Sequence, residues 1–132
     1  MGQGSIIGYE INEKTCQISF YNEKDLEPDT LEVDTDNYQI PLIIGKLRDT
    51  WAYGKDAKRL VTIKDGFTAT RLLSKSLAGD KIEFGEETYD AVWLLSQFIQ
   101  MSLQSFPEID GIVFTVPSLS EEMAQMLRGI AV

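Results

Sequence analysis

The stretch whose residue types could do chemistry is SIIGYEINEKTCQISFYN, residues 5–22. Two runs rich in β-forming residues flank the polar tripeptide at residues 12–14, which predicts a tight hairpin. In the second run, period-2 alternation places Cys16, Ile18 and Phe20 on one face of the strand. A short polar turn between two strands raises the question of whether it holds a phosphate group.

The sequence excludes several catalytic arrangements. It contains no histidine, so no imidazole can act as base, nucleophile or metal ligand, and Ser-His-Asp and Cys-His sites are ruled out. Its one cysteine, Cys16, cannot form an internal disulfide or a cysteine-based zinc site. We expect it to be a small buried hydrophobe on a strand, in a protein of a reducing compartment.

The charge balance narrows the choice of partners. With 12 basic and 21 acidic residues, the chain has a net charge of −9, the wrong sign for phosphodiester backbones and anionic membranes. We therefore expect neither a nucleic acid nor a membrane as partner. No apolar run approaches the ~20 residues that a membrane helix needs, and the N-terminus does not have the pattern of a signal peptide. The sequence predicts a cytoplasmic protein.

The acidic residues are concentrated in residues 22–37, which hold seven acids and one lysine. A calcium-binding loop would need ligands at defined positions, a central Gly and a terminal Glu. That spacing is absent, so we expect a solvated strand with its loops.

Short elements are predicted for the middle of the chain. QIPLIIGK (residues 39–46) and TWAYG (50–54) are apolar runs separated by the polar residues LRD, which predicts a second hairpin. A weak helical run, KDAKRL (55–60), follows. TATRLLSKSLAG (68–79) carries helix formers and stops at Gly79, a position typical of a helix C-cap.

The strongest helix signal lies in residues 86–107. Glu86 and Glu87 would lie in the first turn, where acids favour the helix dipole, and Pro107 would end the helix. The apolar residues recur at spacings of three and four: Val92, Leu95, Ile99, Leu103 and Phe106.

The end of the chain predicts a strand followed by a helix. Residues 112–116 are five consecutive β-formers after an Asp-Gly turn, and such continuous apolarity is typical of a strand covered on both faces. Ser118 lies three residues before Glu121, the spacing of a capping box. Because the chain stops at Val132 without a cap or a polar tail, we expect a fragment of a longer protein.

Four segments, in order and in register, resemble the N-terminal lobe of the Hsp70 nucleotide-binding domain, which belongs to the actin-like ATPase superfamily. They are IIGYEINEKTCQISFY, QIPLIIGKLRDTWAYGKDAK, EFGEETYDAVWLLSQFIQMSLQSF and GIVFTVPSLSEEMAQML. The resemblance implies a ribonuclease H-like α/β fold with a mixed sheet, an antiparallel β-hairpin at its start, and a C-terminal strand-helix unit. It implies one domain over residues 1–132, with 5–36 plus 109–132 as the sheet base and 37–108 as an inserted small α+β subdomain.

In that family the first hairpin turn binds phosphate through backbone N–H groups and Thr hydroxyls, beside an Asp that organises the metal shell. The resemblance places the tentative, degenerate phosphate-binding positions at Gly8, Glu10, Asn12, Glu13, Lys14 and Thr15. Gly8 is retained. Glu10 stands at the position of the Asp and Asn12 at that of a Gly, while Glu13 and Lys14 replace the two Thr residues. Glu13 thus puts a negative charge where phosphate oxygens would lie.

Two further positions depart from the family. Thr70 stands where the family has a lysine that assists hydrolysis, although Arg71 and Leu72 are retained. Pro117 matches a proline that relays the nucleotide state between lobes, but Gln125 replaces the arginine that works with it.

These departures favour a non-catalytic structural or protein-interaction module of a larger cytosolic protein, with the second lobe of its own polypeptide and other proteins as partners. We expect this chain alone to bind no cofactor. The alternative is a chaperone-like ATPase, active only with its second lobe, in which Glu10 holds magnesium through water and Lys14 contacts ATP. A third hypothesis is an unrelated α/β binding domain.

Overall fold

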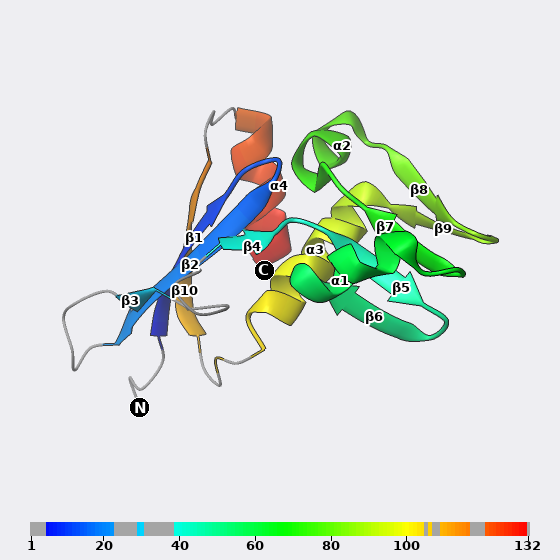
Figure 1. The fold of residues 1–132 in the computed structure, drawn as a ribbon. Helices are drawn as coiled ribbons and strands as arrows, with labels where there is room; N and C mark the ends of the chain where they lie inside the picture. The colour runs from blue at the N-terminus through cyan, green and yellow to red at the C-terminus, as the bar shows by residue number, and fades with distance from the viewer. Residues whose placement is uncertain are drawn as a thin grey trace.

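Strands from both ends of the chain form one five-stranded sheet in the computed structural model, which describes residues 5–22, 29–30, 39–104, 106, 109–116 and 121–131. Its strands are β1 (Ser5–Ile11), β2 (Thr15–Asn22), β3 (Asp29–Thr30), β4 (Gln39–Pro41) and β10 (Ile109–Thr115). β1 lies between β10, which runs parallel to it, and β2, which runs antiparallel. β3 and β4 both pair with β2 (Figure 1).

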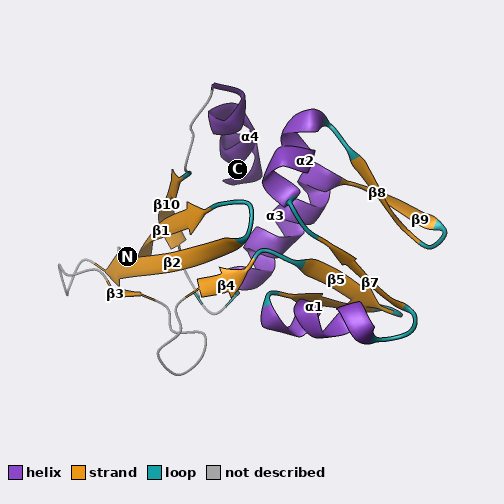
Figure 2. Cartoon of the chain, turned by 45° about the horizontal axis from the view of Figure 1, so that its top comes forward, coloured by secondary structure: helices purple, strands orange, loops and turns teal. Residues whose placement is uncertain are grey.

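Two smaller sheets lie beside the first one. Strands β5 (Ile44–Leu47), β6 (Thr50–Tyr53) and β7 (Gly66–Ala69) form the order β6-β5-β7, and β8 (Lys81–Phe84) pairs with β9 (Glu87–Asp90). The helices are α1 (Lys55–Arg59), a 3-10 turn (Leu60–Thr62), α2 (Leu72–Ala78), α3 (Ala91–Ser102) and α4 (Glu121–Ala131). In Figures 1 and 2, α3 runs between the five-stranded sheet and the smaller sheets.

The structure confirms a mixed α/β fold, the N-terminal hairpin and the second hairpin, and α2 ends before Gly79 as expected. Cys16 and Ile18 are buried on one face of β2. The five-stranded sheet also takes in β4, from within the range expected for the inserted subdomain, because residues 39–41 pair with residues 15–17 of β2. The predicted acidic strand and loops lie mostly outside the described residues.

The helix predicted from residue 86 begins only at Ala91. Residues 87–90 instead form β9, which pairs with β8 across a tight turn that contains Gly85 at a φ of 68°. Such a φ costs little for glycine and favours a turn over a helix. The acids expected in the first helical turn, Glu86 and Glu87, therefore belong to a hairpin.

The buried face of α3 also differs from the predicted one. Its fully or nearly buried members are Ala91, Leu94, Leu95, Phe98, Ile99 and Ser102. Val92 was expected on this face but is 39% exposed. The shift follows from packing on two sides, since α3 contacts α2 as well as β5 and β6.

For β10 the sequence predicted two features, a turn at Asp-Gly and burial on both faces of the strand. The structure shows neither of them. Asp110 and Gly111 lie within the strand and form no turn: Ile109 and residues 111–115 pair with β1, and the register shifts at Asp110, as in a β-bulge. Val113 is 61% exposed, so the strand is not covered on both faces. Ile112 and Phe114 point to the other side and pack against the core. Continuous apolarity in this strand therefore does not mean burial on both sides.

A chain of hydrogen bonds crosses the core from β2 to α3. The Ser102 hydroxyl donates to the Ile99 carbonyl at 2.7 Å, so the Tyr9 hydroxyl must donate to Ser102 Oγ, also at 2.7 Å. Cys16 Sγ in turn donates to Tyr9 at 3.6 Å. Burial raises the pKa of the Tyr9 phenol well above its ordinary value and that of the Cys16 thiol to about 12. Both groups stay protonated at neutral pH and can act as donors.

We expect Ser102→Ala to destabilise the protein by about 1–3 kcal/mol, because the Tyr9 hydroxyl would lose its acceptor while buried. Adding Tyr9→Phe should recover part of that loss, since no unpaired hydroxyl would remain. Urea unfolding monitored by fluorescence measures both effects. Ser96→Ala, at a less buried position of α3, controls for the helix propensity of alanine. Equal stability of the Ser102 and Ser96 variants would contradict the role of this hydrogen bond.

The Cys16 thiol should resist iodoacetamide at about pH 8 in the native protein and react in urea, because only the thiolate is nucleophilic. The raised folded-state pKa keeps the thiol neutral well above the pH at which an unfolded cysteine ionises. Mass spectrometry of the labelled chain gives the fraction modified. Native labelling at the rate of a free model thiol would show that Cys16 is accessible.

Candidate functional site

Backbone N–H groups of the turn between β1 and β2 donate hydrogen bonds to acceptors within the turn itself. Asn12 Oδ1 accepts hydrogen bonds from the backbone N–H groups of Lys14 at 2.8 Å and Thr15 at 2.9 Å. The backbone N–H of Asn12 donates to the carbonyl of Thr15, also at 2.9 Å. This side-chain arrangement is typical of asparagine in tight turns. The backbone N–H groups of Asn12, Lys14 and Thr15 are therefore already paired.

The carboxylate of Glu13 binds the first turn of α2. Its Oε1 accepts from the backbone N–H of Ser74 at 2.8 Å, and its Oε2 accepts from the Ser74 hydroxyl at 3.1 Å. The residue at the N-cap position, Arg71, makes no side-chain hydrogen bond to the helix. Glu13 thus satisfies an amide at the helix start, as a capping carboxylate does, from 61 residues away in sequence.

The other positions of the predicted phosphate site lie on the same hairpin. The carbonyl of Lys14 accepts from the backbone N–H of Leu42 at 2.8 Å, while its side chain is exposed. Thr15 pairs with Pro41 of β4. These contacts join the turn to β4 and to Leu42, the residue that follows it.

Gly8 and Glu10 lie in β1, on the face opposite Tyr9. A Cβ atom at Gly8 would come within 2.5 Å of the Ser19 Oγ on the neighbouring strand β2. Glu10 is exposed and lies between Gln17 of β2 and Thr115 of β10. Among the residues that the structure describes, no three His, Cys, Asp or Glu side chains come together as a metal site would require.

Thr70 is exposed and lies between β7 and α2, four residues before Ser74. The segment that begins at Thr70 contacts the β1–β2 hairpin through Ser74 and Glu13. Arg71 adopts a left-handed conformation with φ 54°, and Leu72 is buried. Pro117 lies outside the described residues, and Gln125 is exposed on α4.

A second polar cluster joins β5 to β9. Lys46 Nζ lies 3.1 Å from Glu87 Oε1 and 3.2 Å from the Tyr89 hydroxyl, which donates to Glu87 at 2.7 Å. The ammonium also lies over the rings of Trp51 and Tyr89, and Trp93 packs against both. The hydrogen bond to Glu87 raises the pKa of Lys46, and that from Tyr89 lowers the pKa of Glu87. The positive charge of Lys46 is therefore paired with the negative charge of Glu87 within the cluster.

The comparisons with known proteins give a family but no function. Residues 27–132 match the model of a family described as "Family of unknown function (DUF5716) C-terminal". The chain belongs to this family. The matched range begins after the β1–β2 hairpin and includes α2 with Ser74. A search of curated proteins found no match. Within the part of the chain that the structure describes, no helix is long and apolar enough to cross a membrane.

The sequence identified the turn but missed its partner. Ser74 lies within a run of ordinary helix formers, and nothing in its neighbours indicates a contact with residue 13. One signal was available: Arg71 is a poor N-cap residue, so the helix that follows needs a capping group from elsewhere.

Glu13→Ala should destabilise the protein by roughly 0.5–2 kcal/mol, the range for the loss of a helix-capping side chain. It should also speed hydrogen exchange at the Ser74 amide, which loses its acceptor. Both can be measured by denaturant unfolding and NMR exchange. Lys14→Ala, at the next position of the same turn, is the matched control and should leave Ser74 exchange unchanged. Equal exchange in the two variants would rule out the capping role.

Proposed function

We propose that this chain is a degenerate lobe of the actin-like ATPase type that serves as a non-catalytic structural or protein-interaction module. Its first hairpin then links the sheet to the inserted segment in place of holding a phosphate. The observation that carries the proposal is the occupation of the turn: two of its amides bind Asn12, and the carboxylate of Glu13 binds Ser74.

The sheet topology supports the likeness to an actin-like lobe. β1 pairs with β2 antiparallel and with β10 parallel, and β10 is followed by α4, which covers the sheet with Met123 and Leu127. The segment from residue 42 to residue 104 separates the early strands from β10, as an inserted subdomain would. A ribonuclease H-like lobe has this order, and fold alone does not determine activity.

The open side of the sheet supports a partner from the same polypeptide. Among the described residues, no strand pairs with the outer edge of β10. Val113 is exposed on the face of the sheet that also carries Gly8 and Ser19. An exposed strand edge with apolar side chains is a site where another strand adds. A second lobe would cover it. A cytoplasmic location is part of the proposal, and the single buried thiol of Cys16 fits it.

One observation favours the alternative function, an ATPase with an altered phosphate loop. The side chains of Glu10 and Lys14 are both exposed near the same end of the hairpin. Glu10 would then hold magnesium through water, and Lys14 would contact a phosphate as a point charge.

We expect the full-length protein that contains this chain to show no binding of ATP with magnesium in isothermal calorimetry at ligand concentrations up to about 1 mM. A dissociation constant of that size corresponds to a binding free energy of about −4 kcal/mol. Phosphate binding would have to break the hydrogen bonds of Asn12 and approach Glu13. Micromolar binding would refute the proposal. If that binding were then lost in Glu10→Ala and Lys14→Ala, the alternative would stand.

A further inference from the structure

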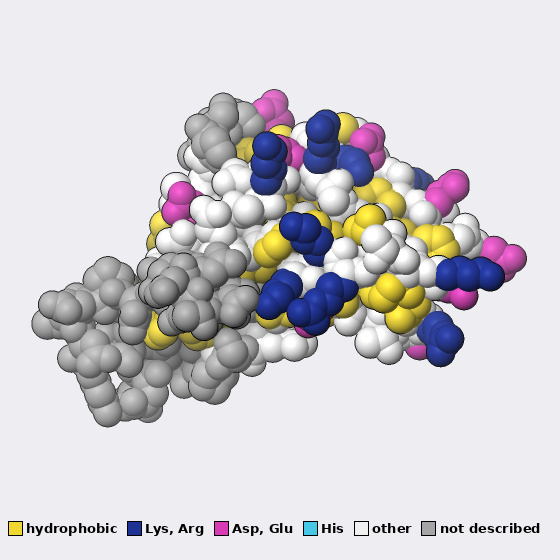
Figure 3. All heavy atoms as spheres, viewed as in Figure 1, with side chains coloured by type: hydrophobic (Ala, Val, Ile, Leu, Met, Phe, Trp, Pro, Cys, Tyr) yellow, Lys and Arg dark blue, Asp and Glu magenta, His cyan; other side chains and the backbone are white. Residues whose placement is uncertain are grey.

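The basic residues of this acidic chain are concentrated in one segment. Residues 46–81 hold nine of the 12 Lys and Arg residues but only four of the 21 acids, a net charge of +5, whereas the rest of the chain carries −14. In Figure 3, Lys and Arg side chains gather in the middle of the viewed face, over α1, with hydrophobic side chains beside them. The net charge of −9 hides this separation.

A hollow of about 550 Å³ lies at this basic segment, between the β5–β6 hairpin and α1 with the 3-10 turn that follows it. Its apolar lining comes from Leu47, Trp51, Leu60 and Ile63. Ile63 is 42% exposed, and the nearby Val61 is 64% exposed, so the apolar surface continues out of the hollow.

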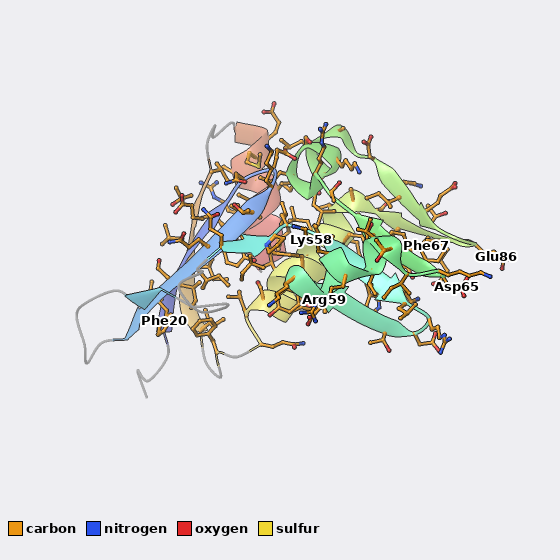
Figure 4. All side chains as sticks on the ribbon, in the orientation of Figure 1. Phe20, Lys58, Arg59, Asp65, Phe67 and Glu86 are labelled. Atoms are coloured by element: carbon orange, nitrogen blue, oxygen red, sulfur yellow. The ribbon has the colours of Figure 1, made fainter. Side chains whose placement is uncertain are left out.

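Two guanidinium groups line the hollow from opposite elements. Arg48 belongs to the β5–β6 turn and Arg59 to the end of α1. The Arg59 side chain is 66% exposed, and its Nη1 lies 3.6 Å from Asp56 Oδ1, an exposed pair that an incoming carboxylate can replace. Figure 4 labels Lys58 and Arg59 on α1. A neighbouring hollow of about 260 Å³ is lined by Lys55 and again by Arg59, so positive charge continues along the helix. We call the two hollows together the basic groove.

The backbone at Arg48 is strained. Its φ of 56° is left-handed, a conformation that glycine or asparagine adopts at lower cost than arginine. The two-residue loop between Leu47 and Thr50 itself requires a left-handed residue at its first position. This turn holds the Arg48 side chain at the edge of the basic groove.

We propose that the basic groove binds an acidic peptide segment of a partner protein, with an aliphatic or aromatic side chain of that segment in the hollow. Guanidinium groups bind carboxylates through paired, charge-assisted hydrogen bonds, and the apolar lining accepts a buried anchor. The proposal rests on the proposed function, since it names a partner class for an interaction module.

Nucleic acid fits the same surface less well. The carboxylate of Asp56 also lines both hollows and would repel phosphates that follow one another along a backbone. The charge of −14 on the rest of the chain would oppose the approach of a long polyanion. A short peptide with a few carboxylates carries fewer negative charges than a nucleic acid of similar length, so both repulsions are smaller, and its apolar anchor can fill the hollow.

The test is a selection from displayed random peptides of about twelve residues on the whole chain, followed by fluorescence anisotropy with the selected peptides. We expect enrichment of Asp and Glu around a Leu, Phe or similar residue. Arg48→Gly and Arg59→Glu should each weaken binding about tenfold. Arg48→Gly should leave the melting temperature unchanged or raise it, because it relieves the left-handed backbone; the loss of binding then cannot come from unfolding.

Arg128→Glu is the matched control, since Arg128 is exposed on α4, outside the basic groove. It should change binding less than about twofold. The proposal is overturned by selected peptides without acidic residues, by equal weakening in the Arg128 variant, or by a single-stranded DNA of similar length that binds as tightly as the best peptide. ATP calorimetry tests the proposed function separately, because the basic groove shares no residue with the β1–β2 turn.

Discussion

The pairing of β1 on both of its edges is the constraint on which the rest of the structure depends. β10 binds one edge and β2 the other, and the alternate side chains Ile7, Tyr9 and Ile11 are completely buried. A slip of one residue would expose these three and bury the opposite face, so the register is fixed. That register sets where the turn at residues 12–14 lies. It also sets which of its side chains meets α2.

Local sequence patterns predicted the helices and strands whose formation depends on residues close together in the sequence. The two early hairpins and the end of α2 at Gly79 follow from alternation, turn residues and a left-handed C-cap. The start of α3 could not be found this way, because residues 87–90 form a strand through pairing with β8, and only Gly85 signals that turn. The exposure of Val113 likewise depends on what covers the sheet, which a strand's own sequence does not contain.

For the candidate site, the sequence gives residue types but few contacts. The turn drew attention because Asn-Glu-Lys stands where the proposed actin-like relatives would have Gly-Thr-Thr. The contact of Glu13 with Ser74 spans 61 residues, so it depends on how α2 packs against the hairpin, which neither local sequence contains. The basic groove was missed for a different reason. A net charge averages over the chain, and here it cancels a segment of opposite sign.

Estimates of interaction free energy support the proposal that this turn does not hold a nucleotide. A micromolar nucleotide site is worth about −8 kcal/mol. Breaking the two hydrogen bonds of Asn12 costs on the order of 1 kcal/mol each, and a phosphate charge about 4 Å from the Glu13 carboxylate meets a repulsion of about 4 kcal/mol near a protein surface. Together these costs reduce such a site to weaker than about millimolar. The same groups already satisfy one another in the unliganded turn and at α2, so the hairpin is ordered without a ligand. Under the proposed function, the same three residues would explain both the absence of a phosphate site and the fixed link between the β1–β2 turn and α2.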